Sequence, residues 1–289
     1  MSLDFDLNLI GCSVIDEVYS VPKLTTIAGS SNLFTSRYRA FGGIGNLWNV
    51  LKSSKLKIHV GTALGPKDSC YVLKNRGNLH ASVVLIKETP SALILSEDGE
   101  KTSYVNWSNL GKIKEFPTKP AKWSHIVYLD LLPNLNLKSI RNNSEIISAD
   151  LCLDTLDEKQ LKKISAKFKQ LDILFLSTNE VISYKELLGI KDIHLTKVAE
   201  AIKHEFEIKH AVILHGSGFV SVATKEGTFT VKTPAKVTNT PVVGAGDKLA
   251  AFIIRELILL PKFNLKTFEK IIRLAQRETA KTLETYEEI

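Results

Sequence analysis

The sequence predicts an α/β fold in which helices cover both faces of a mostly parallel sheet, with a small β-sheet as a lid. Short, uniformly apolar runs alternate with amphipathic ones along most of the chain. This alternation is typical of strands buried on both faces and of the helices that cover them. Two other stretches, Val14 to Leu24 and Ser91 to Asn106, alternate apolar and polar residues with a period of two. We therefore expect antiparallel strands there, outside the main sheet.

The elements can be assigned in chain order. Buried strands are expected at Leu7 to Gly11, Lys57 to Gly65, His125 to Leu129, Glu145 to Leu151, Asp172 to Ser177 and Ala211 to Gly216. Helices are expected at Gly43 to Leu56, Glu158 to Gln170, Thr196 to Ile208 and Asp247 to Leu260. Within the lid, Glu97-Asp98-Gly99-Glu100 is a turn signal between two strand-like halves.

The composition limits the classes of protein that fit. The 289 residues are enough for one large domain. The three cysteines, Cys12, Cys70 and Cys152, form no CxxC pair and are odd in number. This argues against a disulfide scaffold or a structural zinc site and fits a reducing compartment. No apolar stretch is long enough to span a bilayer and the start lacks a signal-peptide pattern, so we expect a cytoplasmic protein without a membrane partner.

The net charge of +7 has two interpretations. It could indicate an anionic partner, either nucleic acid or a phosphorylated small molecule. It could equally come from lysines on solvated helix faces, as in the predicted helix from Glu158 to Gln170, where Leu161, Ile164 and Phe168 would face inward. Because no arginine-rich segment or RNP-like aromatic motif is present, we expect no nucleic-acid partner.

Several common catalytic motifs are missing from the sequence. There is no GxxxxGK[ST] phosphate loop, no GxGxxG after a strand, no HExxH and no GxSxG. The sequence therefore excludes the usual nucleotide loops and the commonest hydrolase signatures.

One short motif near the C-terminal end does suggest chemistry. Gly244-Ala245-Gly246 precedes Asp247, where an apolar helix is expected to begin. The first amides of a helix have no internal partner, and small residues let them approach an anion such as a phosphate. A carboxylate beside them could accept the proton of an attacking hydroxyl. The alternative is an ordinary helix with a glycine-containing start and an acidic first turn.

Other motifs join this one in an order that resembles the ribokinase-like (PfkB) family of carbohydrate and nucleoside kinases. Pro241 to Asp247 is similar to that family's DTTGAGD or NPVGSGD signature, and Gly42 to Asn46 to its Gly-Gly pair followed by an Asn. His59 to Gly65 resembles its viGxlG turn, and Thr89 to Thr102 its lid hairpin. The resemblance covers nearly the whole chain from Gly11 onward.

The resemblance implies a single ribokinase-like domain over residues 1–289, a three-layer α/β/α fold with lid segments at about 14–40 and 88–108. It implies a kinase that transfers the γ-phosphate of ATP, with Mg²⁺, to a hydroxyl of a sugar, sugar phosphate or nucleoside. A homodimer through the lid is a further expectation, because the strand from Val14 alternates and offers a face to another subunit.

Site residues follow from the resemblance position by position. Asp247 would be the catalytic base, and the backbone of Gly244, Ala245 and Gly246 would form the anion hole. The substrate contacts would be Asp16, Gly42, Gly43, Asn46 and Asp130, and the residues beside the nucleotide Asn179, His215, Gly216 and Gly218. Plainer roles remain open: Asp16 as a solvated lid residue, Asn46 as a helix N-cap, and His215 as a polar strand end.

The chain also departs from the family pattern. Pro241-Val242-Val243 replaces the Asp-Thr-Thr that often helps to organise a monovalent cation. The family's Asn-x-x-Glu motif falls at Asn179 to Ile182, where Ile182 takes the place of the glutamate and Glu180 lies nearby. These departures support an alternative function, a catalytically impaired member that acts as a small-molecule-binding or sensor protein.

Overall fold

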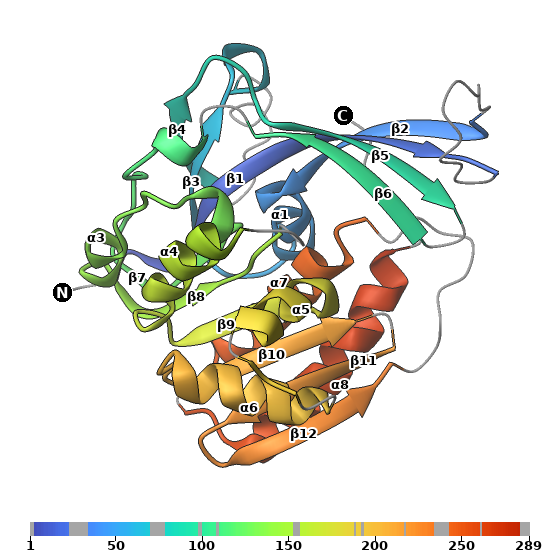
Figure 1. The fold of residues 1–289 in the computed structure, drawn as a ribbon. Coiled ribbons are helices and arrows are strands. Elements are labelled where there is room, and N and C mark those ends of the chain that lie inside the picture. The colour runs from blue at the N-terminus through green and yellow to red at the C-terminus, as the bar shows by residue number, and fades with distance from the viewer. Residues whose placement is uncertain are drawn as a thin grey trace.

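The computed structural model describes residues 3–22, 34–69, 79–97, 100–107, 110–152, 157–187, 189–191, 194–216, 218–233, 243–260 and 262–283. In Figure 1 a twisted sheet runs through the molecule, and helices lie against it on both sides. A second group of strands projects from its upper part (Figure 1).

The main sheet is mostly parallel, as the sequence predicted. Its strands, in spatial order, are β12 (Gly227–Lys232), β11 (Phe219–Thr224), β10 (Ala211–Gly216), β9 (Ile173–Ser177), β8 (Ser144–Ala149), β7 (Ala121–Val127), β1 (Phe5–Ser20), β3 (Ile58–Leu64) and β4 (Leu79–Leu85). From β10 to β4 all neighbouring strands are parallel, and β11 and β12 continue the sheet antiparallel.

Two helical layers cover this sheet. One face carries α1 (Ile44–Leu51), α7 (Ala245–Leu257) and α8 (Leu265–Thr282), and the other carries α3 (Leu137–Arg141), α4 (Glu158–Phe168), α5 (Thr178–Leu187) and α6 (Leu195–Glu205). Successive strand residues point to opposite layers. In β9, Phe175 belongs to the core under α7, whereas Leu174 and Leu176 belong to the core under α4 to α6.

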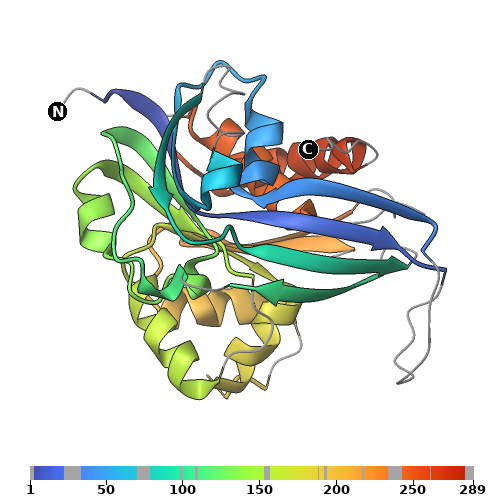
Figure 2. The ribbon, with the colours of Figure 1, turned by 90° about the horizontal axis from the view of Figure 1, so that it is seen from above.

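The lid is a separate small sheet built on β1. The second half of β1 pairs with β2 (Ser36–Gly43) on one side and with β5 (Ser91–Glu97) on the other, and β5 pairs with β6 (Glu100–Asn106). Viewed from above, these four strands extend together away from the helices (Figure 2). The predicted lid strands are thus confirmed where the structure describes them, although only the β1–β2 and β5–β6 pairs are antiparallel and β1 pairs with β5 in parallel. Residues 23–33, 98 and 99 lie outside the described part.

The largest difference between the predicted and observed strand boundaries lies at Gly11. The first strand was expected to end there, but β1 continues through it to Ser20. Gly11 has φ 128°, and a side chain on it would overlap the carbonyl oxygen of Val127. The glycine therefore lets one strand pass from the main sheet into the lid, rather than ending it.

Helix boundaries also differ from prediction. α1 ends at Leu51, not Leu56, because the hydroxyl of Ser54 donates to the carbonyl of Leu51 at 2.6 Å and competes with further helical bonds. α7 begins at Ala245, two residues earlier than expected. Strands β4, β11 and β12 were not predicted.

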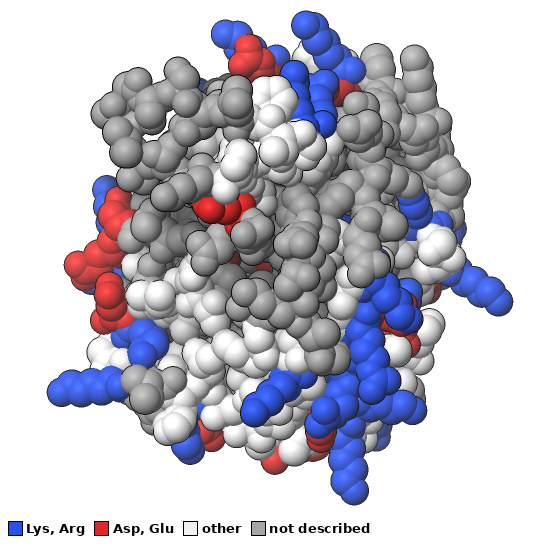
Figure 3. Space-filling model, turned by 90° about the vertical axis from the view of Figure 1, so that its right-hand side faces the viewer, with Lys and Arg blue, Asp and Glu red and all other residues white. Residues whose placement is uncertain are grey.

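The lysines of α4 and of its C-cap agree with the interpretation that much of the net charge comes from lysines on solvated helix faces. Leu161, Ile164 and Phe168 are buried, while the side chains of Lys162 and Lys169 are 65% and 58% exposed and pair with glutamates. On a different face, the right-hand side of the molecule in Figure 1, Lys and Arg side chains gather toward the lower right of the space-filling view (Figure 3). Across the described residues, no helix is long and apolar enough to cross a bilayer.

Candidate active site

The site forms around the start of α7. Gly244 is the N-cap, with φ 71° and ψ 13°, and no side chain caps the helix. A side chain at Gly244 would overlap the amide group of Asn46, so α1 and α7 meet through this glycine. The apolar residues from Leu249 to Ile254 are all buried, which anchors the helix against the sheet.

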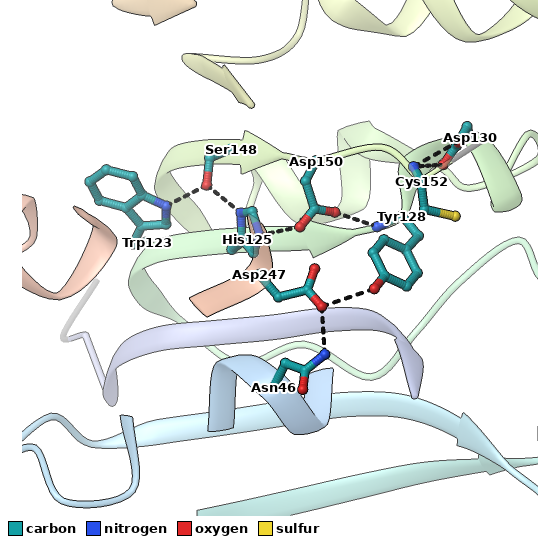
Figure 4. A network of polar contacts seen from close by, with 9 residues as sticks. All are labelled: Asn46, Trp123, His125, Tyr128, Asp130, Ser148, Asp150, Cys152 and Asp247. Carbon is teal, nitrogen blue, oxygen red and sulfur yellow. Dashed lines mark hydrogen bonds and ion pairs between the residues drawn. The ribbon is translucent and has the colours of Figure 1, made fainter. Parts of the chain in front are cut away.

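Asp247 lies in the first turn of α7 and is only 7% exposed. Its Oδ2 accepts hydrogen bonds from Asn46 Nδ2 at 2.8 Å and from the hydroxyl of Tyr128 at 3.0 Å (Figure 4). Among the described residues, no hydrogen bond reaches Oδ1. Two donors therefore fix the plane of the carboxylate and leave one oxygen for another partner.

The surroundings of Asp247 make it a base near neutral pH. Burial raises the pKa of Asp247 from 3.8 to about 7, and the charges of Asp150 and Asp16 act in the same direction. The hydrogen bonds from Asn46 and Tyr128 partly offset this rise. A general base is most effective when its pKa lies near the working pH, and Asp247 meets that condition.

The predicted acceptor residues come together on this side of the site. Asp16, only 6% exposed, packs so closely on Gly42 that any side chain there would overlap its carboxylate. A Cβ on Gly43 would lie 3.2 Å from the ring of Tyr128. Two of the three plainer roles considered above are wrong: Asp16 is buried, and Asn46 bonds Asp247 instead of capping α1, whose N-cap is Gly43.

Asp130 lies in the 3-10 helix η2 (Leu129–Leu131), two residues beyond Tyr128. It is 6% exposed, and both carboxylate oxygens accept from the backbone amide of Cys152, at 3.2 and 3.1 Å. Its charge helps to raise the pKa values of the buried thiols of Cys12 and Cys152, after burial itself. Asp130 thus belongs to a buried acidic region around Cys12, Cys152 and Glu180, and among the described residues it is not one of the groups that contact Asp247 or shift its pKa.

The predicted nucleotide residues lie at the ends of β9 and β10. A Cβ on Gly246 would lie 2.8 Å from the ring of His215, so His215 borders the start of α7. Gly216 lies beside Thr178, because a Cβ on this glycine would be 3.0 Å from the threonine methyl carbon. Gly218 faces open space among the described residues, and Asn179 is exposed in the first turn of α5.

Glu180 has a structural role in this region. Its carboxylate accepts from the amide of Ser177 at 2.7 Å, and the Ser177 hydroxyl accepts from the amide of Glu180, which is a capping box for α5. Burial raises the pKa of Glu180 to about 8. Ile182, at the position of the family's glutamate, is 57% exposed.

Sequence reasoning missed Tyr128 and Asp150. Asp150 Oδ1 accepts from the amide of Tyr128 at 2.6 Å, and Oδ2 lies 3.2 Å from His125 Nε2 (Figure 4). Asp150 directly follows β8, and polar residues at the carboxyl ends of parallel strands are typical of ligand sites. That signal was available in the sequence, whereas nothing in it marks the left-handed conformation of Tyr128.

No described set of three or more His, Cys, Asp and Glu side chains could hold a metal ion. Cys12 and Cys152 are both free thiols.

The fold and the site are typical of a phosphotransferase of the sugar-kinase type. They combine a mostly parallel sheet, a lid that carries Asp16, and a buried carboxylate at a helix start that no side chain caps. The family model for pfkB carbohydrate kinases matches residues 6–286. The chain belongs to this family and is a PfkB-type carbohydrate kinase. Comparison of the sequence with curated proteins finds no match.

Solved structures show the same fold at low sequence identity. A ribokinase from Cryptococcus neoformans in complex with ADP has a TM-score of 0.73 and 16% identity, over 98% of this chain and 95% of that one. A nucleoside kinase from Burkholderia thailandensis in complex with inosine has a TM-score of 0.71 and 14% identity, over 97% and 92%. A pyrophosphate-dependent kinase of the ribokinase family, complexed with a pyrophosphate analog and myo-inositol, has a TM-score of 0.67 and 16% identity, over 98% and 96%.

Proposed function

We propose that this kinase transfers the γ-phosphate of ATP to a hydroxyl of an uncharged sugar or nucleoside, with Asp247 as the general base. The observation that carries the proposal is the geometry of Asp247. Its Oδ2 is occupied by Asn46 and Tyr128, and its pKa is raised to about 7. The open Oδ1 is the oxygen that would receive the proton of the acceptor.

In this mechanism the acceptor hydroxyl donates to Oδ1 of Asp247. As the hydroxyl oxygen forms a bond to the γ-phosphorus, its proton passes to Oδ1 and the bond from the phosphorus to the bridging oxygen breaks. The leaving nucleotide keeps that electron pair, so atoms and charge balance. The transferred phosphoryl group carries negative charge throughout, and it needs hydrogen-bond donors placed in advance.

The start of α7 would supply those donors. No side chain caps the helix, and the small residues Gly244, Ala245 and Gly246 leave its first amides accessible. The partial positive charge at a helix start favours phosphate. The proposed donors are thus the same backbone amides that the sequence predicted as the anion hole.

The charges around the site favour an uncharged acceptor. The buried ionisable groups that influence the pKa of Asp247 include the carboxylates Asp150 and Asp16, and these would repel a second phosphate. Lys248 does not compensate, because its Nζ donates to the carbonyl of Thr282 at 2.9 Å at the end of α8. Asp16, Asn46 and the backbone of Gly42 and Gly43 would bind hydroxyl groups.

The phosphate donor is also part of the proposal. An ADP complex among the similar structures supports a nucleotide, beside Asn179, His215, Gly216 and Gly218. Mg²⁺ would accompany the phosphates. A pyrophosphate-dependent enzyme among the similar structures makes pyrophosphate the necessary comparison in any assay.

The test is a coupled assay with ATP or pyrophosphate against sugars, polyols, nucleosides and sugar phosphates, followed by Asp247→Asn on the substrate found. The nearly isosteric variant should bind nucleotide normally and lose roughly two to four orders of magnitude in kcat, the range for loss of a general base. Equal kcat values for the variant and the parent would exclude Asp247 as the base.

A second candidate function is a catalytically impaired member that binds a small molecule as a sensor. The exposed Ile182 at the family's glutamate position, and the use of Glu180 as a capping residue, favour it. Acceptor binding detected by calorimetry without turnover with either donor would support this candidate against the first.

Three further expectations remain predictions. We treat residues 1–289 as one kinase domain and place it in the cytoplasm, in keeping with the free thiols of Cys12 and Cys152 in the described part of the chain. A homodimer through the lid is supported by the outer lid face, where Leu93 and Tyr104 are 42% and 61% exposed. Light scattering of the parent and of Leu93→Glu would test the dimer.

A further inference from the structure

Tyr128 has an unusual backbone conformation at a position next to the base. It follows β7 directly and caps η2 with φ 62° and ψ 59°. Among the described residues, only Tyr128 and Glu207 have positive φ without being glycine. A bulky residue in the left-handed region is sterically unfavourable and persists only where its surroundings hold it.

Asp150 holds this conformation from two sides. Its Oδ1 accepts from the amide of Tyr128 at 2.6 Å, and its backbone carbonyl accepts from the amide of Leu129 at 3.0 Å. The amide of Asp150 in turn donates to the carbonyl of Ile126 at 3.1 Å. The turn after β7 is therefore tied to the residue after β8 through three hydrogen bonds.

A buried chain of side chains orients Asp150. The indole N–H of Trp123 donates to Ser148 Oγ at 2.7 Å, and that oxygen lies 2.8 Å from Nδ1 of His125 (Figure 4). Because the indole can only donate, Ser148 can use its own proton toward Nδ1. This arrangement leaves Nε2 of His125 to donate to Asp150 Oδ2, at 3.2 Å.

The ring of Tyr128 reaches from this turn across to α7. Gly43 makes room for it, and Trp107 at the lid packs edge-on against it with ring centroids 6.3 Å apart. Its hydroxyl donates to Oδ2 of Asp247 at 3.0 Å. Burial, with the nearby charge of Asp247, raises the pKa of Tyr128 well above its usual value, so the phenol stays protonated and remains a donor.

We infer that Tyr128 is a positioning residue for phosphoryl transfer. Its hydroxyl, together with Asn46, occupies Oδ2 of Asp247 and directs Oδ1 at the acceptor hydroxyl, while Asp150 and His125 fix the turn that carries it. The inference rests on the proposed role of Asp247 as the base. It assigns a role in catalysis to a residue outside the GAGD and Gly-Gly motifs.

A purely structural role predicts something different. If Tyr128 only filled space, its loss would lower stability without changing the protonation of Asp247. As a donor to the carboxylate, it stabilises the ionised form. The other groups that face Asp247 are Asp150 beyond β8, Asp16 on β1, Lys248 on its own helix and His215 beside Gly246.

The test uses Tyr128→Phe, which keeps the ring and removes the donor. Tyr104→Phe on the exposed lid face is the matched control. The protein is labelled with ¹³C at aspartate carboxyl carbons, and the Asp247 signal is identified by its loss in Asp247→Asn. The midpoint of its titration is then measured by NMR in the absence of any substrate.

We expect the midpoint in Tyr128→Phe to rise by at least about half a pH unit, because a hydrogen bond to the ionised carboxylate is lost. Tyr104→Phe should titrate like the parent. An unchanged midpoint in Tyr128→Phe would overturn the inference whether or not an acceptor substrate is known.

Asp150→Asn provides an independent arm if Tyr128→Phe does not fold. Asparagine keeps an oxygen for the amide of Tyr128 but removes the negative charge that raises the pKa of Asp247. The titration midpoint of Asp247 in Asp150→Asn should therefore fall. A midpoint that rises, or does not move, would show that Asp150 does not lie near enough to Asp247 for Tyr128 to link the two.

Kinetics complete the test once the acceptor is known. Tyr128→Phe should lower kcat roughly 10-fold with little change in either KM, and the acidic limb of its pH profile should move upward with the NMR midpoint. A shifted midpoint with unchanged kcat would overturn the catalytic role. A parent enzyme that phosphorylates none of the acceptors would refute the proposed function, while the NMR result would still decide whether Tyr128 acts on Asp247.

Discussion

The acceptor side and the nucleotide side of this site are built differently. Around Asp247, glycines and polar side chains fit so closely that added atoms at Gly42 or Gly244 would overlap a neighbour. Around Gly218 and Asn179 the described structure is open, and the family's glutamate is replaced by the exposed Ile182. Under the proposed function, the chain keeps close packing on the acceptor side, and the departures from the family pattern predicted from the sequence lie on the donor side.

Among the variants that compare the two sides, Gly244→Ala should have the largest effect, because it disturbs the proposed acceptor side. The new methyl would overlap the Asn46 amide, and the positive φ of 71° disfavours any side chain there. Displacing Asn46 releases Oδ2 of Asp247, so we expect kcat to fall about 100-fold or more, as misplacement by an ångström can do.

Two alanine variants sharpen this result. Among the described residues, a methyl group on Gly218 has no neighbour within 4 Å, so Gly218→Ala on the proposed nucleotide side should change kcat less than about 3-fold. Gly111→Ala, whose nearest neighbour atom would be 3.9 Å away, controls for general effects of the substitution. Equal losses at Gly244 and Gly218 would contradict the difference between the two sides.

A smaller effect, confined to one substrate, is expected from Asp16→Asn. Losing a charged acceptor of hydroxyl hydrogen bonds should raise KM for the acceptor roughly 10-fold and leave KM for ATP unchanged. Glu17→Gln is the control, because Glu17 belongs to the other lid face, where it pairs with Arg37 at 3.4 Å. A rise in both KM values would place Asp16 outside the acceptor pocket.

The smallest effect concerns stability on the nucleotide side. Glu180 has a pKa of about 8 in the folded protein against an ordinary 4.5. Between these values the native state holds a proton that the unfolded state has lost, so stability falls as pH rises from about 4.5 to 8. Glu180→Gln keeps an oxygen for Ser177 and removes that slope, so its Tm at pH 8 should exceed the parent's by several degrees, because each kcal/mol shifts Tm by roughly 2–4 °C. Parallel Tm curves for the two proteins between pH 5 and 8 would exclude this contribution.

Much of the fold could be predicted because its signals are local. The apolar runs of β9 and β10 predicted their strands within about one residue, since burial on both faces makes the first four residues of each strand apolar. Strand β12 was missed because its residues are mostly half-buried or exposed, and Gly227-Thr228-Phe229-Thr230 has no continuous apolar run.

The site was predictable only in part. Asp16, Asn46 and Asp247 were found because they belong to motifs, and the structure brings Asn46 and Asp247 within 2.8 Å although 201 positions separate them. Tyr128 was not found, because its role depends on a left-handed turn held by Asp150 and on the space left at Gly43. Both conditions are tertiary, and neither has a sequence pattern of its own.

The passage of β1 through Gly11 has a mechanical consequence. Asp16 lies five residues farther along an unbroken strand, roughly 17 Å from Gly11 at the usual rise of a β-strand. A bend of about 10° at Gly11 would then carry Asp16 through an arc of roughly 3 Å, the scale of one hydrogen bond. Gly11 is paired with Val127, the residue before Tyr128. A lid that bends at Gly11 would therefore move directly beside the turn that carries Tyr128. Under the proposed function, an acceptor that binds Asp16 would shift this strand, and the Gly11–Val127 pair would transmit the shift to Tyr128 and Asp247.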